Sequence, residues 1–496
     1  MIIKNRIKTI VLIFIVLGMI FIFSCGNGDS ENMNISSGDE AGIKNPGAES
    51  AAEGRIPDGL PERDYENYEF GILSVDPKDV NEIPQVQVEE EIGEIINDST
   101  YHRNMAVEER FNIRIKPIYV TWLEAPEYLR RAVNAGDTTY DLALVMQHQV
   151  GNVVVSNLLR PWNELEHVVD FDKPWWQKEA NRAFNFGDTV YITTGDMCTS
   201  IFYYSNAMYF NKKMAADYGI EDIYDVVRNS KWTIDYLMNV TRNIYSEFND
   251  GTASLENLYG FGLTCANEID AFVAASGLSI IEQKNCELVF GINNERMINL
   301  VSKAVDLCHR PSTFINKDIW GVSRDELFRM FAADRIFITP GTFMSLINNT
   351  RDMDSDYGVL PYPMLDEKQG GYFNEPATLL ATLVIPTTVQ TENIERVGII
   401  TEALNREAYY TVRPAFYDVA LKVKTVRDED SEEMIDIILD GRRYDMGMAF
   451  DFSSMAYILR QLVNDNGTDF VSRFERQENS GNAALQRIQN SFQDLN

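Results

Sequence analysis

The chain has 496 residues, of which 45% are hydrophobic and 11% aromatic, and its formal net charge at pH 7 is −31. This composition is that of a globular protein, and the length exceeds what one hydrophobic core usually supports. The strong negative charge argues against nucleic acids and anionic lipid surfaces as partners.

Residues 1–24 have the parts of a secretory signal peptide. Three basic residues precede an apolar run over 10–23, which is too short for a comfortable membrane span. The four residues 22–25 (IFSC) resemble a bacterial lipobox, in which the signal is cut before a cysteine that carries a diacylglyceryl group. We therefore predict lipidation of Cys25; an ordinary cleaved signal or a short anchor is the alternative. No later apolar run is long enough to span a membrane.

Residues 25–64 are predicted to form a flexible tether. The segment is rich in Gly, Ser, Asn and acidic residues and has few large apolar ones. Such a segment cannot bury enough surface to offset its ordering entropy. It would hold a globular body away from the membrane.

Beyond residue 64 the chain first alternates strand and helix patterns. Strand-like segments cover 68–75, 111–120 and 140–145, and helical ones cover 86–111 and 123–135. This alternation predicts an α/β fold with a mostly parallel sheet. Ligands bind beyond the carboxyl ends of such strands, which makes Asp76 and Gln147 candidate ligand contacts.

From about residue 161 the sequence becomes richer in loops and aromatic residues. Further strands are predicted at 189–192, 201–204, 336–339, 356–360, 382–385 and 421–426. A helix over 325–333 precedes one of them, and the part from about residue 392 is mainly helical. No clear internal repeat is found.

Four cysteines follow the lipidation site: Cys198, Cys265, Cys286 and Cys308. None forms a CxxC pair. In an oxidising compartment they could form two disulfides in three connectivities, or remain free thiols. Their spacings do not indicate a metal site.

Several short segments, in order along the chain, carry a family resemblance. They are 135–142 (AGDTTYDL), 159–165 (LRPWNEL), 173–176 (KPWW), 209–214 (YFNKKM), 231–237 (KWTIDYL), 358–363 (GVLPYP) and 384–386 (VIP). Together they resemble the extracellular solute-binding proteins of family 1, the sugar-type binding lipoproteins of ABC importers. The resemblance implies a periplasmic-binding-protein-like α/β fold with two lobes. The chain would cross the hinge between them more than once, and a ligand cleft would lie between the lobes.

The resemblance also implies lobe boundaries and a function. One lobe would comprise 65–198 plus 325–388, and the other 199–324 plus 389–496. The protein would be a monomeric, lipid-anchored subunit on the outer face of the cell membrane or in the periplasm. It would capture a sugar of oligosaccharide length by lobe closure and deliver it to ABC permease subunits. The alternatives are the same fold binding another solute, such as a peptide, polyol or metabolite, and a surface lipoprotein hydrolase or adhesin.

A sugar presents apolar C–H faces, on which aromatic rings stack, and hydroxyls, which carboxylates and amides bind. The candidate aromatic platforms are Trp175, Trp176, Tyr204, Trp320 and Phe343. The candidate polar partners are Asp76, Gln147, Asp196 and Glu375. Trp162 and Trp232 are predicted to be core residues. Trp175 and Trp176 are adjacent, so at most one of them should face a ligand.

Signals for an enzyme are weak. The sequence has no GxxxxGK[ST], HExxH or GxSxG motif, and its four histidines lack metal-ligand partners at helical spacing. The acidic run at 352–356 fails as a calcium loop, because its glycine comes one place late and Pro363 stands where a bidentate Glu is needed. We therefore expect no catalytic residues, no metal and no cofactor.

Overall fold

The computed structural model describes residues 54–79, 86–248, 253–319, 321–350, 353–422 and 429–495. The segment Asp58–Asn496 forms one compact unit. Residues 1–24, Cys25, most of the predicted tether and Trp320 lie outside the described residues. Within the described ranges, no helix combines the length and the apolar character that a membrane crossing requires.

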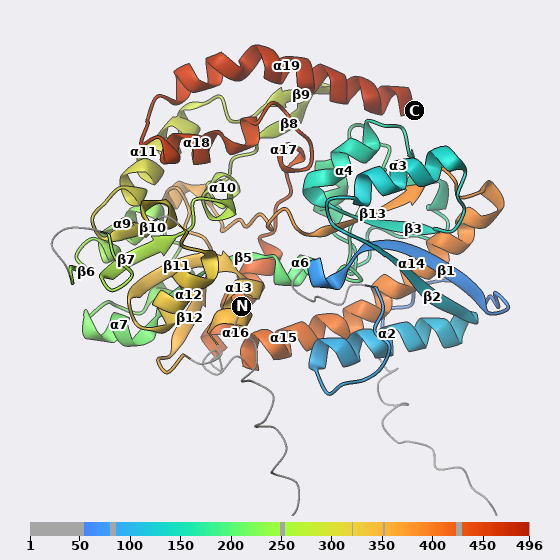
Figure 1. Ribbon diagram of the computed structural model, residues 1–496, viewed down its shortest axis with the longest axis horizontal. Coiled ribbons are helices and arrows are strands. Elements are labelled where there is room, and N and C mark those ends of the chain that lie inside the picture. The colour runs from blue at the N-terminus through green and yellow to red at the C-terminus, as the bar shows by residue number, and fades with distance from the viewer. Residues whose placement is uncertain are drawn as a thin grey trace, which may run out of the picture. The chain divides into compact units, whose positions relative to one another are not determined.

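The first of the two main sheets has the strand order β2-β1-β3-β13-β4 (Figure 1). Its strands are β1 (Tyr68–Val75), β2 (Ile113–Val120), β3 (Leu142–Met146), β4 (Leu159–Arg160) and β13 (Ala381–Pro386). The first three run parallel, whereas β13 is antiparallel to both β3 and β4. The predicted β-α-β alternation is therefore confirmed.

Helices cover both faces of this sheet, with α3 and α4 on one side and α2 and α14 on the other (Figure 1). Every residue of β3 is buried, as expected for a parallel strand covered on both faces. The bounds are α2 (Ile95–Phe111), α3 (Ala125–Ala135), α4 (Gln147–Val154) and α14 (Ile394–Tyr410).

The second main sheet has the order β10-β7-β11-β5-β12, with β6 paired to β7. Its strands are β5 (Asn206–Asn211), β6 (Tyr245–Ser246), β7 (Leu258–Leu263), β10 (Thr313–Ile315), β11 (Ile336–Thr342) and β12 (Tyr357–Leu360). Its surrounding helices include α9 (Ile234–Thr241), α10 (Asn267–Ala275), α11 (Glu295–Cys308), α12 (Arg324–Ala332), α13 (Phe343–Asn349) and α16 (Glu429–Asp440).

Shorter elements and the C-terminal helices complete the unit. They are α5 (Lys178–Phe184), α6 (Ser200–Tyr203), α7 (Lys212–Asp217), α8 (Ile223–Arg228), the hairpin β8 (Ile281–Lys284) and β9 (Glu287–Phe290), α15 (Val412–Lys422), α17 (Met446–Ala449), α18 (Ile458–Asn464) and α19 (Phe470–Leu495). The C-terminal part is thus helical, as predicted.

Two predicted strands are wrong, and a third is contradicted where it is described. Residues 201–204 lie in and just after the short helix α6, and 189–192 form no strand. Residues 421–422 end helix α15, while 423–428 lie outside the described residues. Short apolar and aromatic runs cannot be assigned to strand or helix by periodicity alone.

The strand pairing corrects the predicted lobe boundaries. Both β11 and β12 pair with β5, so they belong to the second sheet and not with 65–198. Only β13 returns to the first sheet, and helix α14, which follows it, packs on α2. The return crossing therefore lies between β12 and β13. A local sequence pattern does not show which distant strand a segment will join.

The chain passes from the first sheet to the second between β4 and β5, and back between β12 and β13. Segments later in the chain also connect the part around the first sheet with the part around the second. Helix α15 packs on α2 beside the first sheet, and the ring of its Phe416 lies 5.5 Å from that of Phe343 at the start of α13, beside the second sheet. At the end of α19 the ring of Phe492 packs near Tyr191, whose hydroxyl donates to the carbonyl of Leu495.

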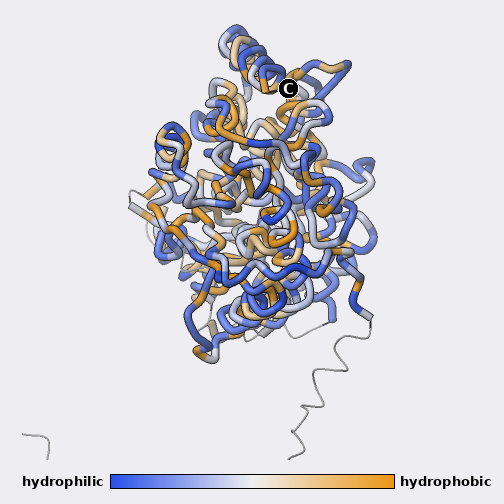
Figure 2. Tube along the Cα trace, turned by 90° about the vertical axis from the view of Figure 1, so that its right-hand side faces the viewer, coloured by the Kyte–Doolittle hydropathy of each residue, from blue (hydrophilic) through white to orange (hydrophobic). Residues whose placement is uncertain are grey.

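Hydrophobic side chains fill the interior around both sheets. Figure 2 shows hydrophobic residues mostly along the inner parts of the trace and hydrophilic ones along much of its outside. Trp162 and Trp232 are fully buried, which confirms their predicted place in the core. The indole of Trp232 donates to the carbonyl of Pro361 at 2.8 Å.

Candidate functional site

Two neighbouring pockets share the side chain of Glu375, which lies on the segment that leads from β12 back to β13. The smaller pocket has a volume of about 10 Å³, enough for one water molecule. The larger has a volume of about 240 Å³. Because this segment is a crossing between the two sheets, the pockets lie where elements associated with both sheets meet.

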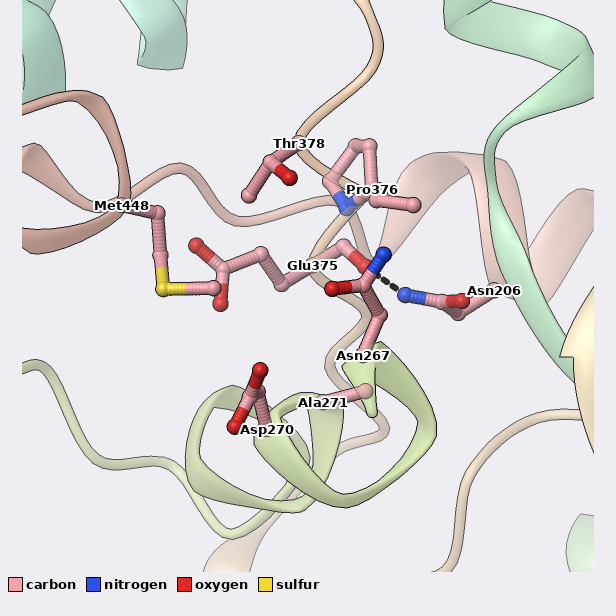
Figure 3. Close-up of a pocket in the computed structure, with 9 residues that line it drawn as sticks. Asn206, Asn267, Asp270, Ala271, Glu375, Pro376, Thr378 and Met448 are labelled. Atoms are coloured by element: carbon pink, nitrogen blue, oxygen red, sulfur yellow. Dashed lines mark hydrogen bonds between the residues drawn. The ribbon is translucent and has the colours of Figure 1, made fainter. Parts of the chain in front are cut away.

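The smaller pocket is built by β5, helix α10, the crossing segment and α17 (Figure 3). Asn206 at the start of β5 donates its amide to the carbonyl of Glu375 at 2.7 Å, which fixes the crossing segment to the second sheet. The residues that line it are Asn206, Asn267, Asp270, Ala271, Glu375, Pro376, Ala377, Thr378 and Met448.

The larger pocket is built by the end of α10, the crossing segment and the connection between α16 and α17. Two backbone hydrogen bonds join the latter two segments, from Asn374 to Gly441 at 2.9 Å and from Arg443 to Asn374 at 2.8 Å. The Arg443 guanidinium lies 4.4 Å from the ring centre of Phe373. The pocket is lined by Ala274, Gly277, Leu278, Ser279, Phe373, Glu375, Arg443, Tyr444 and Asp445.

Two carboxyl groups line the larger pocket, in different surroundings. Asp445 accepts backbone N–H bonds from Ile280 at 2.5 Å, Ile281 at 3.2 Å and Gly447 at 2.7 Å. Burial nevertheless raises the pKa of Asp445 to about 6. Burial and the neighbouring charge of Asp445 raise the pKa of Glu375 well above its usual value.

Some of the buried polar atoms without a hydrogen-bond partner belong to residues in or beside these pockets. Among the described residues they include Glu375 Oε1, Asn206 Oδ1 and both side-chain amide atoms of Asn374. The two amide atoms of Gln147, at the start of α4, share this property. Most buried polar groups in proteins are paired. Glu375 Oε1 and Asn206 Oδ1 belong to residues that line the pockets, so these two oxygens can accept hydrogen bonds from the hydroxyl or amine groups of a ligand.

The structure places only one of the predicted site residues, Glu375, in the pockets. Asp76 and Gln147 lie at the carboxyl ends of β1 and β3, where Asp76 accepts a bond from the Lys78 amide and Gln147 is fully buried. The side chain of Asp196 is buried in its ion pair with Arg413. Trp320 lies outside the described residues. A ligand role for these residues stays a prediction.

The predicted aromatic platforms lie in the protein interior. Trp175 and Trp176 are buried, and their indole nitrogens donate to the two carboxylate oxygens of Glu402, each at 2.7 Å. Tyr204 is buried after α6, and the ring of Phe343 lies 5.5 Å from that of Phe416. None of the four lines either pocket, and their ligand roles likewise stay predictions.

Several residues at this site are not among those predicted from the sequence. Phe373, Arg443, Tyr444 and Asp445 line the larger pocket, but their local sequence carries no ligand-binding signal.

Glu402 should make stability depend on pH. Burial raises its pKa from 4.5 to about 7. Between these values the folded state keeps a proton that the unfolded state releases, so stability is greatest below pH 4.5 and falls as the pH rises to about 7. At about 1.4 kcal/mol per pKa unit, the loss is up to about 3 kcal/mol. Denaturant unfolding should show a flatter pH profile for Glu402→Gln, and parallel profiles would contradict this assignment.

Among the described residues, Cys198, Cys265, Cys286 and Cys308 form no disulfide, and Cys198 and Cys308 are buried. The ranges that the structure covers contain no cluster of His, Cys, Asp and Glu side chains suited to hold a metal ion.

No family model matches the chain, and no curated protein matches it. Solved structures do match. One is an ABC substrate-binding protein from Listeria monocytogenes in complex with cycloalternan, with a TM-score of 0.54, 11% identity, and coverage of 84% of this chain and 99% of that one. Another is an extracellular solute-binding protein from Staphylococcus aureus in complex with maltose (TM-score 0.53, 10% identity, coverage 86% and 98%).

A third is UgpB from Mycobacterium tuberculosis in complex with glycerophosphocholine (TM-score 0.51, 13% identity, coverage 85% and 98%). Identities this low establish the fold alone. The chain thus has the two-lobe fold of the ABC-transporter solute-binding proteins, and the resemblance identified in its sequence is confirmed at the level of the fold.

Proposed function

We propose that this chain is the solute-binding component of an ABC importer and binds a carbohydrate at the pockets around Glu375. The observation that carries the proposal is the position of these pockets on a crossing between the two sheets of a solute-binding fold. Two of the three similar structures named above are complexes with carbohydrates, which supports the ligand class.

The chemistry of the pocket lining suits a hydroxyl-rich ligand. The carboxyl groups of Glu375 and Asp445 and the side-chain amide oxygen of Asn206 can accept hydrogen bonds from hydroxyl groups. The half-buried ring of Phe373 offers an apolar face for the C–H side of a sugar ring. The guanidinium of Arg443 lies over the Phe373 ring. A sugar could therefore stack on this ring only if the guanidinium moved away or if both groups contacted the ring together.

The remaining parts of the proposal follow from the same function. The bound solute is of oligosaccharide length, the lobes close on it, and the partners are ABC permease subunits in the membrane. The protein acts as a monomer without enzymatic activity. The phosphodiester ligand of one similar structure makes a non-sugar solute the alternative.

A thermal-shift screen tests the ligand class. The full chain is heated with maltose, maltotetraose, other neutral mono- and oligosaccharides, and glycerophosphocholine as the non-sugar probe. A ligand at 100 times its Kd should stabilise the folded state by about 2.7 kcal/mol. If only glycerophosphocholine stabilises the protein, the ligand is a non-sugar solute and not a carbohydrate. If no probe shifts the melting temperature, the proposed function is contradicted.

The proposed location is the outer face of the cell membrane, through a lipid on Cys25. This part rests on the signal-like sequence before that residue. We expect Cys25→Ser to abolish labelling by a radioactive fatty acid and to release the protein from the membrane fraction, while carbohydrate binding persists. Ser24→Ala is the control and should stay anchored. Full membrane retention of Cys25→Ser would contradict the lipid anchor.

A further inference from the structure

Glu375 differs from the other buried acidic side chains of the described residues in having no partner of its own. Asp141, Asp196, Glu268 and Asp270 each form an ion pair with an arginine. Glu402 binds two indole N–H groups, and Asp445 binds three backbone N–H groups. Glu375 is only 3% exposed, its Oε1 has no hydrogen-bond partner, and it takes part in no ion pair among the described residues.

Two arginines near the pockets are engaged elsewhere. Arg460 binds Asp270 on α10. Arg443 lies over the Phe373 ring and donates to the carbonyl of Arg442 at 3.3 Å. The Glu375 carboxyl points away from Asn206, toward the side of the smaller pocket that Met448 lines (Figure 3). The neighbouring charge that affects the pKa of Glu375 is that of Asp445. Asp445 is also acidic, so it cannot neutralise a negative charge on Glu375.

A buried carboxyl group in such a place is stable only with a proton or with a cation from outside the protein. Taking an unpaired charge out of water costs several kcal/mol per ion. A ligand hydroxyl would supply one hydrogen bond and no charge. A primary ammonium supplies three donors and the missing positive charge.

We propose that Glu375 anchors an ammonium group of the bound solute, so that the ligand is an amine-bearing carbohydrate of the glucosamine type. This inference rests on the proposed carbohydrate-binding function. The larger pocket adds the Asp445 carboxyl as a second acceptor and the rings of Phe373 and Tyr444 as surfaces that attract cations. The net charge of −31 also favours the approach of cationic solutes.

Calorimetric titration of the full chain in detergent tests the inference with ligands that differ mainly in charge. The probes are the β-1,4-linked glucosamine tetramer, its fully N-acetylated form and maltotetraose. We expect the amine-bearing tetramer to bind at least tenfold more tightly than either neutral probe. Glu375→Gln should remove that preference, because the amide keeps the shape of the side chain and loses its charge.

Glu287→Gln, an exposed position on β9 that lines neither pocket, is the matched control and should keep the preference. Glu375→Asp retains the negative charge and should keep part of the preference for the amine-bearing tetramer. It provides a second variant if Glu375→Gln does not fold. Free glucosamine should also compete better than N-acetylglucosamine on the unmodified protein.

The outcomes separate the two proposals. If neutral probes bind and the amine brings no preference, or if Glu375→Gln keeps the preference, the inference is overturned and the carbohydrate-binding function stands. If none of the three probes binds, the inference is also overturned, and the thermal-shift screen of other sugars decides the proposed function separately.

Discussion

Replacing Arg413 with methionine should destabilise the protein by about 3–5 kcal/mol, because it leaves the fully buried Asp196 carboxylate without its partner. The guanidinium of Arg413 binds both oxygens of that carboxylate and also donates to the carbonyl of Pro174 at 3.2 Å. The contact ties helix α15 to the loops that lead from the first sheet to the second. Denaturant unfolding measures the loss.

The control for this substitution is Arg130→Met. Arg130 forms an exposed ion pair with Glu127 on α3, and surface pairs contribute only about 0–1 kcal/mol. The double variant Asp196→Leu, Arg413→Met should recover part of the stability, because it removes both charges together. Equal, small effects for Arg413→Met and Arg130→Met would contradict the structural role of the buried pair.

Removing the ring of Phe373 should weaken carbohydrate binding by about 2–3 kcal/mol, in the range of a binding hot spot. This is roughly a thirty- to two-hundredfold increase in Kd. Because Phe373 is only half buried, the variant Phe373→Ala should melt close to the unmodified protein. Calorimetric titration with the best carbohydrate of the thermal-shift screen measures the effect.

Phe248→Ala removes a ring of the same kind that is 71% exposed and lines neither pocket. Its affinity should be unchanged. If Phe373→Ala keeps the affinity of the unmodified protein, the larger pocket does not contact the carbohydrate ring.

Local sequence pattern predicted the first sheet well and the second less well. The strands β1, β2 and β3 are parallel and separated by helices; β1 and β3 are largely buried apolar runs and β2 begins with an alternating pattern, so each carries a strong local signal. The pairing of β11 with β5 joins residues more than 120 positions apart. Nothing in the periodicity of either strand indicates that partner.

The site shows the same limit at the level of single residues. Glu375 was predicted as a polar partner and lies in both pockets. The loop-rich stretch around Trp175 and Trp176 favours a ligand-facing position, yet both indoles bind Glu402, 226 or more residues later in the chain. Asp196 likewise binds Arg413 from a distant helix. Long-range partners such as these cannot be inferred from local composition.

Hydrogen–deuterium exchange of the full chain, with and without the carbohydrate that gives the largest thermal shift, locates the segments that contact the bound solute. If the solute binds at the pockets around Glu375, amide protection should rise at 373–378, at 443–448 and along α10. Protection confined to other segments at saturating carbohydrate would contradict the assignment of the binding site.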